Sequence, residues 1–169
     1  QITSWGTLFD PADPFAEHYL GIARREAERL GIPFVTVACT SPQDIGSGVQ
    51  ALHAQGVGGI MQIPSIMIGG GFSSLIKQAR ESGMPVVASS TGNQGTPLAL
   101  GASFFDNGYA QGQLMIRVLR GESPAGIPFR TSAIPKMVVD LGAAADFGVT
   151  IPPEVIKRAS TVIPVKRDV

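Results

Sequence analysis

Residues 63–76 read IPSIMIGGGFSSLI and connect an apolar run to a helix-like pattern through three consecutive glycines. A strand, a glycine-rich turn and a helix in this order are typical of α/β proteins that hold a ligand at the turn. The turn lacks the Lys-Ser/Thr pair of a phosphate-binding loop, and the sequence contains no G-x-G-x-x-G. We therefore interpret the glycines at 69–71 as turn geometry and close backbone approach rather than as a phosphate site.

The segments on either side of this turn repeat the same order of strand and helix. The expected strands are residues 2–8, 33–39, 58–63 and 84–88. The expected helices between them are residues 14–30, 41–55 and 72–82. Asp13 and Pro14 suit the start of the first helix, and Gly31 suits its end. Short connections and nearly continuous apolar strands predict an α/β fold with a parallel sheet and helices on both faces.

The pattern changes after residue 90. Residues 91–101, TGNQGTPLALG, indicate a polar, glycine-rich connection. The further expected elements are a strand at 102–105, a helix at 107–120, a strand at 136–141 and a short helix at 150–159. The apolar stripe of the helix at 107–120 consists of Leu114, Met115, Val118 and Leu119.

Composition excludes several classes of protein. Of the 169 residues, 44% are hydrophobic and 15% are charged, which favours a folded globular chain. The 13 basic and 13 acidic residues form no basic cluster, so nucleic acid is not an expected partner. Apolar runs are shorter than a membrane-spanning helix requires. The single Cys39 lies in an apolar strand, where we expect a buried, inert thiol.

Ligands of open parallel sheets bind at the carboxyl ends of the strands. Small or hydrogen-bonding side chains follow four of the expected strands. One aromatic side chain, Phe9, comes directly after the first expected strand. The predicted ligand-binding residues are Phe9, Asp10, Ser41, Gln62, Ser65, Ser90, Thr91, Asn93 and Gln94. We expect Phe9, Ser65 and residues 89–94 to converge on one edge of the sheet.

No catalytic or metal-binding constellation is visible at these strand ends. Asp10 and Asp13 belong to DPADP, which is turn and helix-cap chemistry. His18 and His53 lie on separate expected helices without metal-ligand spacing, and the chain contains no G-x-S-x-G. We therefore expect no enzyme, no metal and no cofactor.

The last third of the chain resembles a known family. Residues 99–129, ALGASFFDNGYAQGQLMIRVLRGESPAGIPF, are similar to the C-terminal half of ABC-transporter substrate-binding proteins associated with aromatic amino acid uptake. The terminal motif of that family is matched by Val138, Val139, Asp140, Leu141, Ala144, Gly148, Ile151 and Pro152. Asp140 stands where the family commonly has Asn.

The resemblance implies one lobe of a two-lobed, type I periplasmic-binding (Rossmann-like) fold together with a return segment. Residues 1–99 would form the second lobe, residues 100–135 would return to the first lobe, and residues 136–169 would add a final strand and helix to the second lobe. One position departs from the family pattern. Ser65 stands where many members carry an Asp suited to a ligand ammonium group, which indicates a more apolar or differently charged solute.

The resemblance also implies a function. The expected protein is the solute-binding component of an ABC importer, which captures an amino acid or related apolar acid between its lobes and delivers it to a permease. It would be periplasmic or a cell-surface lipoprotein, although the chain begins at Gln1 and shows no export signal. The alternatives left open are the effector-binding domain of a transcriptional or sensory regulator and a flavodoxin-like enzyme.

The return segment leads to one further expectation. The apolar stripe at 107–120 has no obvious cover if the first lobe is absent, and a stripe of that size is a liability in a monomer. We expect residues 100–135 to pack against a second copy of the chain, to exchange with it, or to be poorly ordered.

Overall fold

The computed structural model describes residues 2–92, 94–128 and 135–165 of the chain. Within them, the strands are β1 (Trp5–Phe9), β2 (Phe34–Ala38), β3 (Gly59–Met61), β4 (Val86–Ala88), β5 (Leu98–Gly101), β6 (Lys136–Asp140) and β7 (Thr161–Ile163). The helices are α1 (Pro14–Leu30), α2 (Asp44–Ala54), α3 (Ile66–Gly70), α4 (Phe72–Glu81), α5 (Phe104–Leu119), α6 (Leu141–Asp146) and α7 (Pro153–Arg158), with a 3₁₀ turn at Pro124–Gly126.

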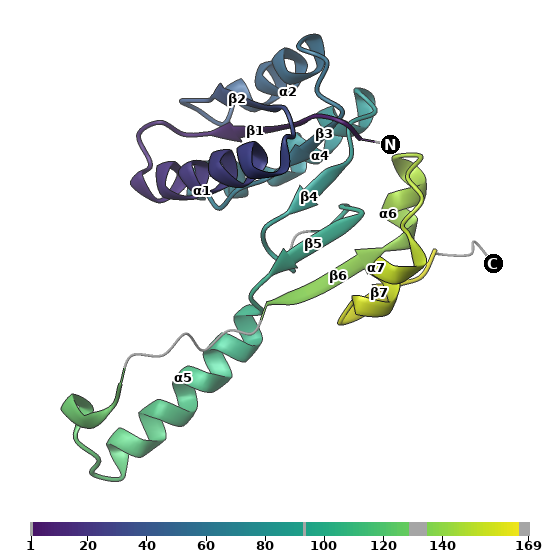
Figure 1. The fold of residues 1–169 in the computed structure, drawn as a ribbon. Coiled ribbons are helices and arrows are strands. Elements are labelled where there is room, and N and C mark those ends of the chain that lie inside the picture. The colour runs from purple at the N-terminus through teal and green to yellow at the C-terminus, as the bar shows by residue number, and fades with distance from the viewer. Residues whose placement is uncertain (1, 93, 129–134, 166–169) are drawn as a thin grey trace.

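The described strands form one sheet in the order β2-β1-β3-β4-β5-β6-β7 (Figure 1). Strands β1 to β5 pair in parallel, β6 runs antiparallel to β5, and β7 is parallel to β6. The four strands predicted for the first 90 residues are therefore confirmed, and so is their parallel pairing. From β1 to β4, helices carry the chain back to the start of the next parallel strand, whereas no helix is found among the described residues between β4 and β5.

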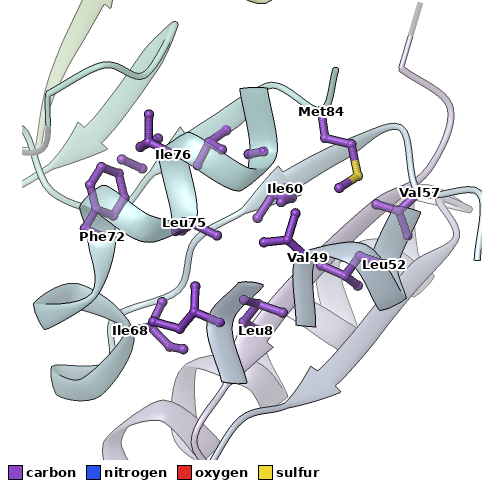
Figure 2. Close-up of a cluster of buried hydrophobic side chains, with 14 of the residues drawn as sticks. Leu8, Val49, Leu52, Val57, Ile60, Ile68, Phe72, Leu75, Ile76 and Met84 are labelled. Carbon is purple, nitrogen blue, oxygen red and sulfur yellow. The ribbon is translucent and has the colours of Figure 1, made fainter. Parts of the chain in front are cut away.

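Helices cover the two faces of the sheet unequally. On one face α2 and α4 enclose a large core, in which Leu52, Ile60, Leu75 and Val86 are fully buried (Figure 2). The other face carries a smaller cluster, in which Leu20 and Ala23 of α1 pack near Ile63. Alternation along the strands divides the side chains between these layers, since successive residues point to opposite faces. The predicted α/β class with helices on both faces is confirmed.

Local capping sets the boundaries of the longer helices. The side chain of Asp13 accepts a hydrogen bond from the Phe15 amide at the start of α1, and Gly31 ends the helix with φ of 66°. Glycine adopts this left-handed conformation without steric cost. At the start of α6, Asp140 accepts from the Ala143 amide at 2.9 Å. An aspartate therefore performs at this position the capping that asparagine would also perform.

The structure corrects two predictions about the middle of the chain. The residues expected as a strand at 102–105 include Phe104 and Phe105, which begin α5 because the hydroxyl of Ser103 accepts the Asp106 amide at 3.2 Å. The strand lies immediately before, in β5, within residues 91–101 that were expected to be a connection only. The short helices α3 and α6 and the strand β7 were not predicted.

Helix α5 projects away from the sheet (Figure 1). None of its residues is buried, and Phe104, Phe105 and Leu119 are 78%, 80% and 80% exposed. Its orientation is held at its base, where Asp106 forms an ion pair with Lys136 at the start of β6. No described helix is long and apolar enough to cross a membrane.

Candidate ligand-binding site

The parallel pairing brings the carboxyl ends of β1 to β5 to one edge of the sheet. Phe9 at the end of β1 pairs with Ala38 of β2, and Met61 at the end of β3 pairs with Val87 of β4. The loops that carry most of the predicted ligand-binding residues start at these ends. The edge is thus the place where a ligand of an open α/β sheet is expected.

The β1–α1 loop presents one aromatic and two acidic side chains. Phe9 is half-buried and packs against the α1 cluster of Leu20, Ala23 and Ile63. Asp10 Oδ1 accepts the Ala12 amide at 2.8 Å, so the Asp10 side chain closes a tight turn. This bond commits one carboxylate oxygen of Asp10 to the loop, and no other partner of its side chain is found among the described residues.

Asp13 links this loop to the end of β3. Its Oδ1 caps α1, while its Oδ2 accepts the Ile66 amide at 3.4 Å. The sequence alone predicts Asp13 only as a helix cap, and it places Ser65 where a carboxylate is common in the family. The structure places the Asp13 carboxylate against the residue after Ser65. A carboxylate is therefore present at this part of the edge, although it comes from a different loop.

The β2–α2 loop is organised around Asp44. Asp44 Oδ2 accepts hydrogen bonds from the Thr40 amide at 2.9 Å, the Thr40 hydroxyl at 3.0 Å and the Ser41 amide at 2.9 Å. These bonds, led by the one from the Thr40 amide, lower the pKa of Asp44. The Ser41 amide therefore stabilises the conformation of the β2–α2 loop through its hydrogen bond to Asp44. The adjacent Cys39 is buried as expected, and burial raises the pKa of its thiol.

Gln62 connects the ends of β3 and β4 and is only 5% exposed. Its Oε1 accepts from the Ser89 amide at 3.0 Å and the Ser89 hydroxyl at 2.9 Å. Its Nε2 donates to the Ile63 carbonyl at 2.6 Å. The side-chain amide thus has both ends occupied within the protein, and it positions the two loops.

Ser65 and Ile66 have opposite environments at the start of α3. Ser65 is 8% exposed, and its hydroxyl has no hydrogen-bond partner in the described structure. Ile66 is 85% exposed at the same edge. An isolated exposed isoleucine is ordinary on a protein surface. Ile66 nevertheless lies beside Asp13, where it could contact a ligand. It was not among the predicted ligand-binding residues.

The β4–β5 loop divides the remaining predicted residues. Ser90 and Thr91 are half-buried at the sheet edge, and Ser90 Oγ accepts the Gly92 amide at 3.4 Å. Gln94 lies farther along the loop, where it lines a hollow of about 800 Å³ against α4 with Lys77 and Arg80. The predicted contact Asn93 lies outside the described residues.

The charge of this edge has one sign. Residues 9–13, 39–44, 62–66 and 89–92 contain three aspartates and no lysine, arginine or histidine. No group of three or more described His, Cys, Asp or Glu side chains is placed to hold a metal ion. The edge offers hydroxyls, backbone groups, carboxylates and the apolar side chains of Phe9 and Ile66. These groups suit binding of a polar or cationic solute more than of an anion.

A second hollow of about 820 Å³ runs along the α1 face of the sheet and touches the site at Gln62 and Ser89. Phe9, Asp10, Ser41, Ser65, Ser90 and Thr91 line neither of the two hollows. The described residues thus form an open wall at the sheet edge and do not enclose a ligand. The predicted ligand-binding residues did not include Thr40, Asp44 or Ile66, although Asp44 follows Ser41 at the spacing of a capping residue.

Comparison with known proteins identifies the family. A family model described as ABC transporter substrate binding protein matches residues 2–163. No curated protein matches the chain.

Several solved structures share the fold. A conserved domain protein from Vibrio cholerae is 21% identical with a TM-score of 0.85. An ABC domain from Streptococcus pneumonia, solved with L-Trp, is 26% identical with a TM-score of 0.84. A ligand-free, open substrate-binding protein with adhesive properties from Clostridium difficile is 18% identical with a TM-score of 0.73.

These comparisons also define how much of such a protein is present. The matches cover 96% of this chain and 55% of each of those three chains, so the chain spans about half the length of the structures it resembles. Its sheet, its helices and the family model agree with the resemblance found in the terminal motif. The chain belongs to the ABC transporter substrate-binding protein family and has one lobe of the type I periplasmic-binding fold.

Proposed function

We propose that this chain forms one wall of the cleft in the solute-binding component of an ABC importer. The observation that carries the proposal is the family match over residues 2–163, and the hydroxyl, backbone and carboxylate groups at the carboxyl edge of the sheet support it. The family is one of solute-binding proteins rather than enzymes. The proposed mode of binding is capture of a small molecule between this lobe and a second one.

The division of the chain into lobes belongs to the same proposal. Residues 1–99 and 136–169 supply the second lobe, and residues 100–135 extend to a first lobe. Support comes from the projection of α5, whose apolar side chains are uncovered, and from the antiparallel pairing of β5 with β6 at Gly101 and Lys136. The chain leaves the sheet after Gly101 at the end of β5 and returns to it at Lys136, the start of β6.

We further propose that the solute is a small amine-bearing or neutral polar molecule with an apolar part, a class that includes amino acids. The three aspartates and the absence of basic residues at this edge favour an ammonium or hydroxyl group here. Phe9 and Ile66 provide apolar contact. A solute carboxylate would bind groups of the other lobe. The proposed site is periplasmic or at the cell surface, and the proposed partner is the permease of the importer.

The test uses the two-lobed protein that contains this chain. Amino acids, including L-tryptophan, and small amines are screened by thermal shift and then by titration calorimetry. A ligand at about 100 times its dissociation constant should stabilise the protein by about 2.7 kcal/mol. Asp10→Asn keeps the acceptor for Ala12 and removes the charge, so it should weaken binding of a cationic solute by about 1–3 kcal/mol.

A control substitution on the same lobe separates a site effect from a general loss of stability. Glu28→Gln removes one negative charge from the last turn of α1, at the opposite end of that helix from the β1–α1 loop, and should leave affinity unchanged. Chemical turnover of the bound molecule would contradict the proposal, and so would tight binding that is equally insensitive to both substitutions.

A further inference from the structure

The segment after β3, residues 62–70 and here called the β3–α3 segment, is weakly held at its start by its own residues. Helix α3 has five residues, a length at which an isolated helix is unstable in water. The side chain of Ile68 anchors the middle of α3 in the large core (Figure 2). Ser65 occupies the N-cap position, but its side chain makes no capping hydrogen bond. Gly69 and Gly70 contribute no side chain, so the start of α3 depends on contacts from outside the segment.

Two side chains join this segment to the neighbouring loops. Asp13 Oδ2 accepts the Ile66 amide, the first amide of α3, at 3.4 Å. Gln62 Oε1 accepts the Ser89 amide at 3.0 Å and the Ser89 hydroxyl at 2.9 Å. The first bond ties the β3–α3 segment to the β1–α1 loop, and the other two tie it to the loop after β4. Asp13 thus provides, from a different loop, an acceptor for an amide that would otherwise lack one at the start of α3.

The groups proposed to contact the solute lie on the loops that these bonds join. Asp10 belongs to the same loop as Asp13, and Ser90 directly follows Ser89. Ile66 begins α3 and is 85% exposed. A solute that meets loops already held in place does not have to order them, and avoiding that entropic cost strengthens binding. The hydrogen bonds between the loops therefore bear on affinity without touching the solute.

We propose that Asp13 is a positioning residue of the solute site, which acts by holding Ile66 and the start of α3 against the β1–α1 loop. Its effect on affinity rests on the proposed function, whereas its effect on the β3–α3 segment requires no ligand. A positioning residue affects every solute that uses the wall. Loss of the Asp13 bond should therefore weaken an amine and its counterpart without the amine equally, whereas the charge of Asp10 should matter to the amine alone.

Asp13→Asn separates this role from the capping of α1. Asparagine caps a helix about as well as aspartate, so the Phe15 amide keeps its acceptor. A side-chain amide has only one oxygen, so the Ile66 amide loses its acceptor. Asp140→Asn is the matched control, because Asp140 also caps a helix, accepting the Ala143 amide at 2.9 Å. It lies at the opposite edge of the sheet, since β6 runs antiparallel to β5.

Hydrogen–deuterium exchange of the two-lobed protein without solute tests the effect on the segment. Amides of residues 62–70 should exchange roughly threefold faster or more in Asp13→Asn than in the unmodified protein, because local opening no longer breaks the bond to Ile66. Asp140→Asn should leave these amides unchanged. Amides of α2 report general destabilisation and should be the same in all three proteins. Unchanged exchange of residues 62–70 in Asp13→Asn would overturn the proposal.

Titration calorimetry tests the effect on affinity, with L-tryptophan as the first probe and then any other amino acid that binds. Each is compared with its counterpart that carries a hydroxyl in place of the ammonium group. Asp13→Asn should weaken both by the same factor, about two- to tenfold. A loss confined to the amino acid would make Asp13 a direct contact and reject the positioning role. If no small molecule binds, the proposed function fails, while the exchange experiment still decides whether Asp13 holds the segment.

A second substitution provides a rescue that a purely structural role does not predict. Gly69→Ala favours helix within α3, and a Cβ at Gly69 meets nothing within 4 Å. Gly71 is unsuitable, since a Cβ there would lie 2.2 Å from Ile45. Added to Asp13→Asn, Gly69→Ala should slow the exchange of residues 62–70 and restore part of the lost affinity. Slower exchange without any recovery of affinity would show that holding this segment is not how Asp13 supports binding.

Discussion

At the scale of single residues, Asp44 shows how one carboxylate organises a loop. It accepts three hydrogen bonds from Thr40 and Ser41, and these lower its pKa in the folded state. A carboxylate with a lowered pKa contributes stability above the pKa of the unfolded chain, which is about 3.9 for aspartate. That contribution is lost as the pH falls below this value and through the folded pKa.

We therefore expect Asp44→Ala to melt at a lower temperature than the unmodified chain at pH 7. The difference should shrink as the pH is lowered from about 4. Thermal melts of both proteins between pH 7 and pH 2.5 provide the measurement. A difference that stays constant across this range would show that the hydrogen bonds to the ionised group are not what Asp44 contributes.

Gln62 and Ser65, both predicted as ligand contacts, provide a second test at the residue scale. Gln62→Ala leaves the Ser89 amide without its acceptor and should destabilise the chain by about 1–3 kcal/mol. Ser65→Ala removes a buried hydroxyl without a partner and should be neutral or stabilising by up to about 1 kcal/mol. Urea denaturation measures both. Equal losses would mean that the Ser65 hydroxyl is satisfied in solution.

At the scale of elements, the strand β5 depends on a glycine. A Cβ at Gly101 would lie 2.2 Å from the Ser89 carbonyl oxygen, so Gly101→Ala should displace β5 and destabilise the chain by about 1–3 kcal/mol. Gly108 in α5 is the matched control, because a Cβ there meets nothing within 4 Å. Gly108→Ala should instead stabilise by about 0.5–1 kcal/mol. The two urea transitions should therefore move in opposite directions.

At the scale of the whole molecule, the proposed function predicts a change of shape. In the two-lobed protein, a bound solute contacts both walls and should favour the closed arrangement of the lobes. Small-angle X-ray scattering should then show a smaller radius of gyration with solute than without. Asp10→Asn should require more solute for the same decrease. An unchanged radius at saturation would exclude closure as the mode of capture.

The sequence by itself determined the regular part of this protein. The period of its apolar residues predicted the strands β1 to β4, their crossover helices and the parallel pairing, because these features depend on local patterns and on short connections. The caps at Asp13 and Gly31 were also visible, since capping is chemistry between near neighbours. Most candidate site residues could be placed near one sheet edge, because each of them follows a strand and the carboxyl ends of parallel strands lie at the same edge.

Only the tertiary structure decided how that edge is used and which surfaces stay uncovered. Gln62 was predicted as a ligand contact, but Ser89, 27 positions away, occupies its side chain. Asp13 supplies a carboxylate beside Ser65 from a loop that is distant in sequence. The hollow along the α1 face of the sheet and the exposed side chains of α5 depend on which helices pack on which strands. Such contacts join residues that are far apart in the chain, so the local periodicity of the sequence does not predict them.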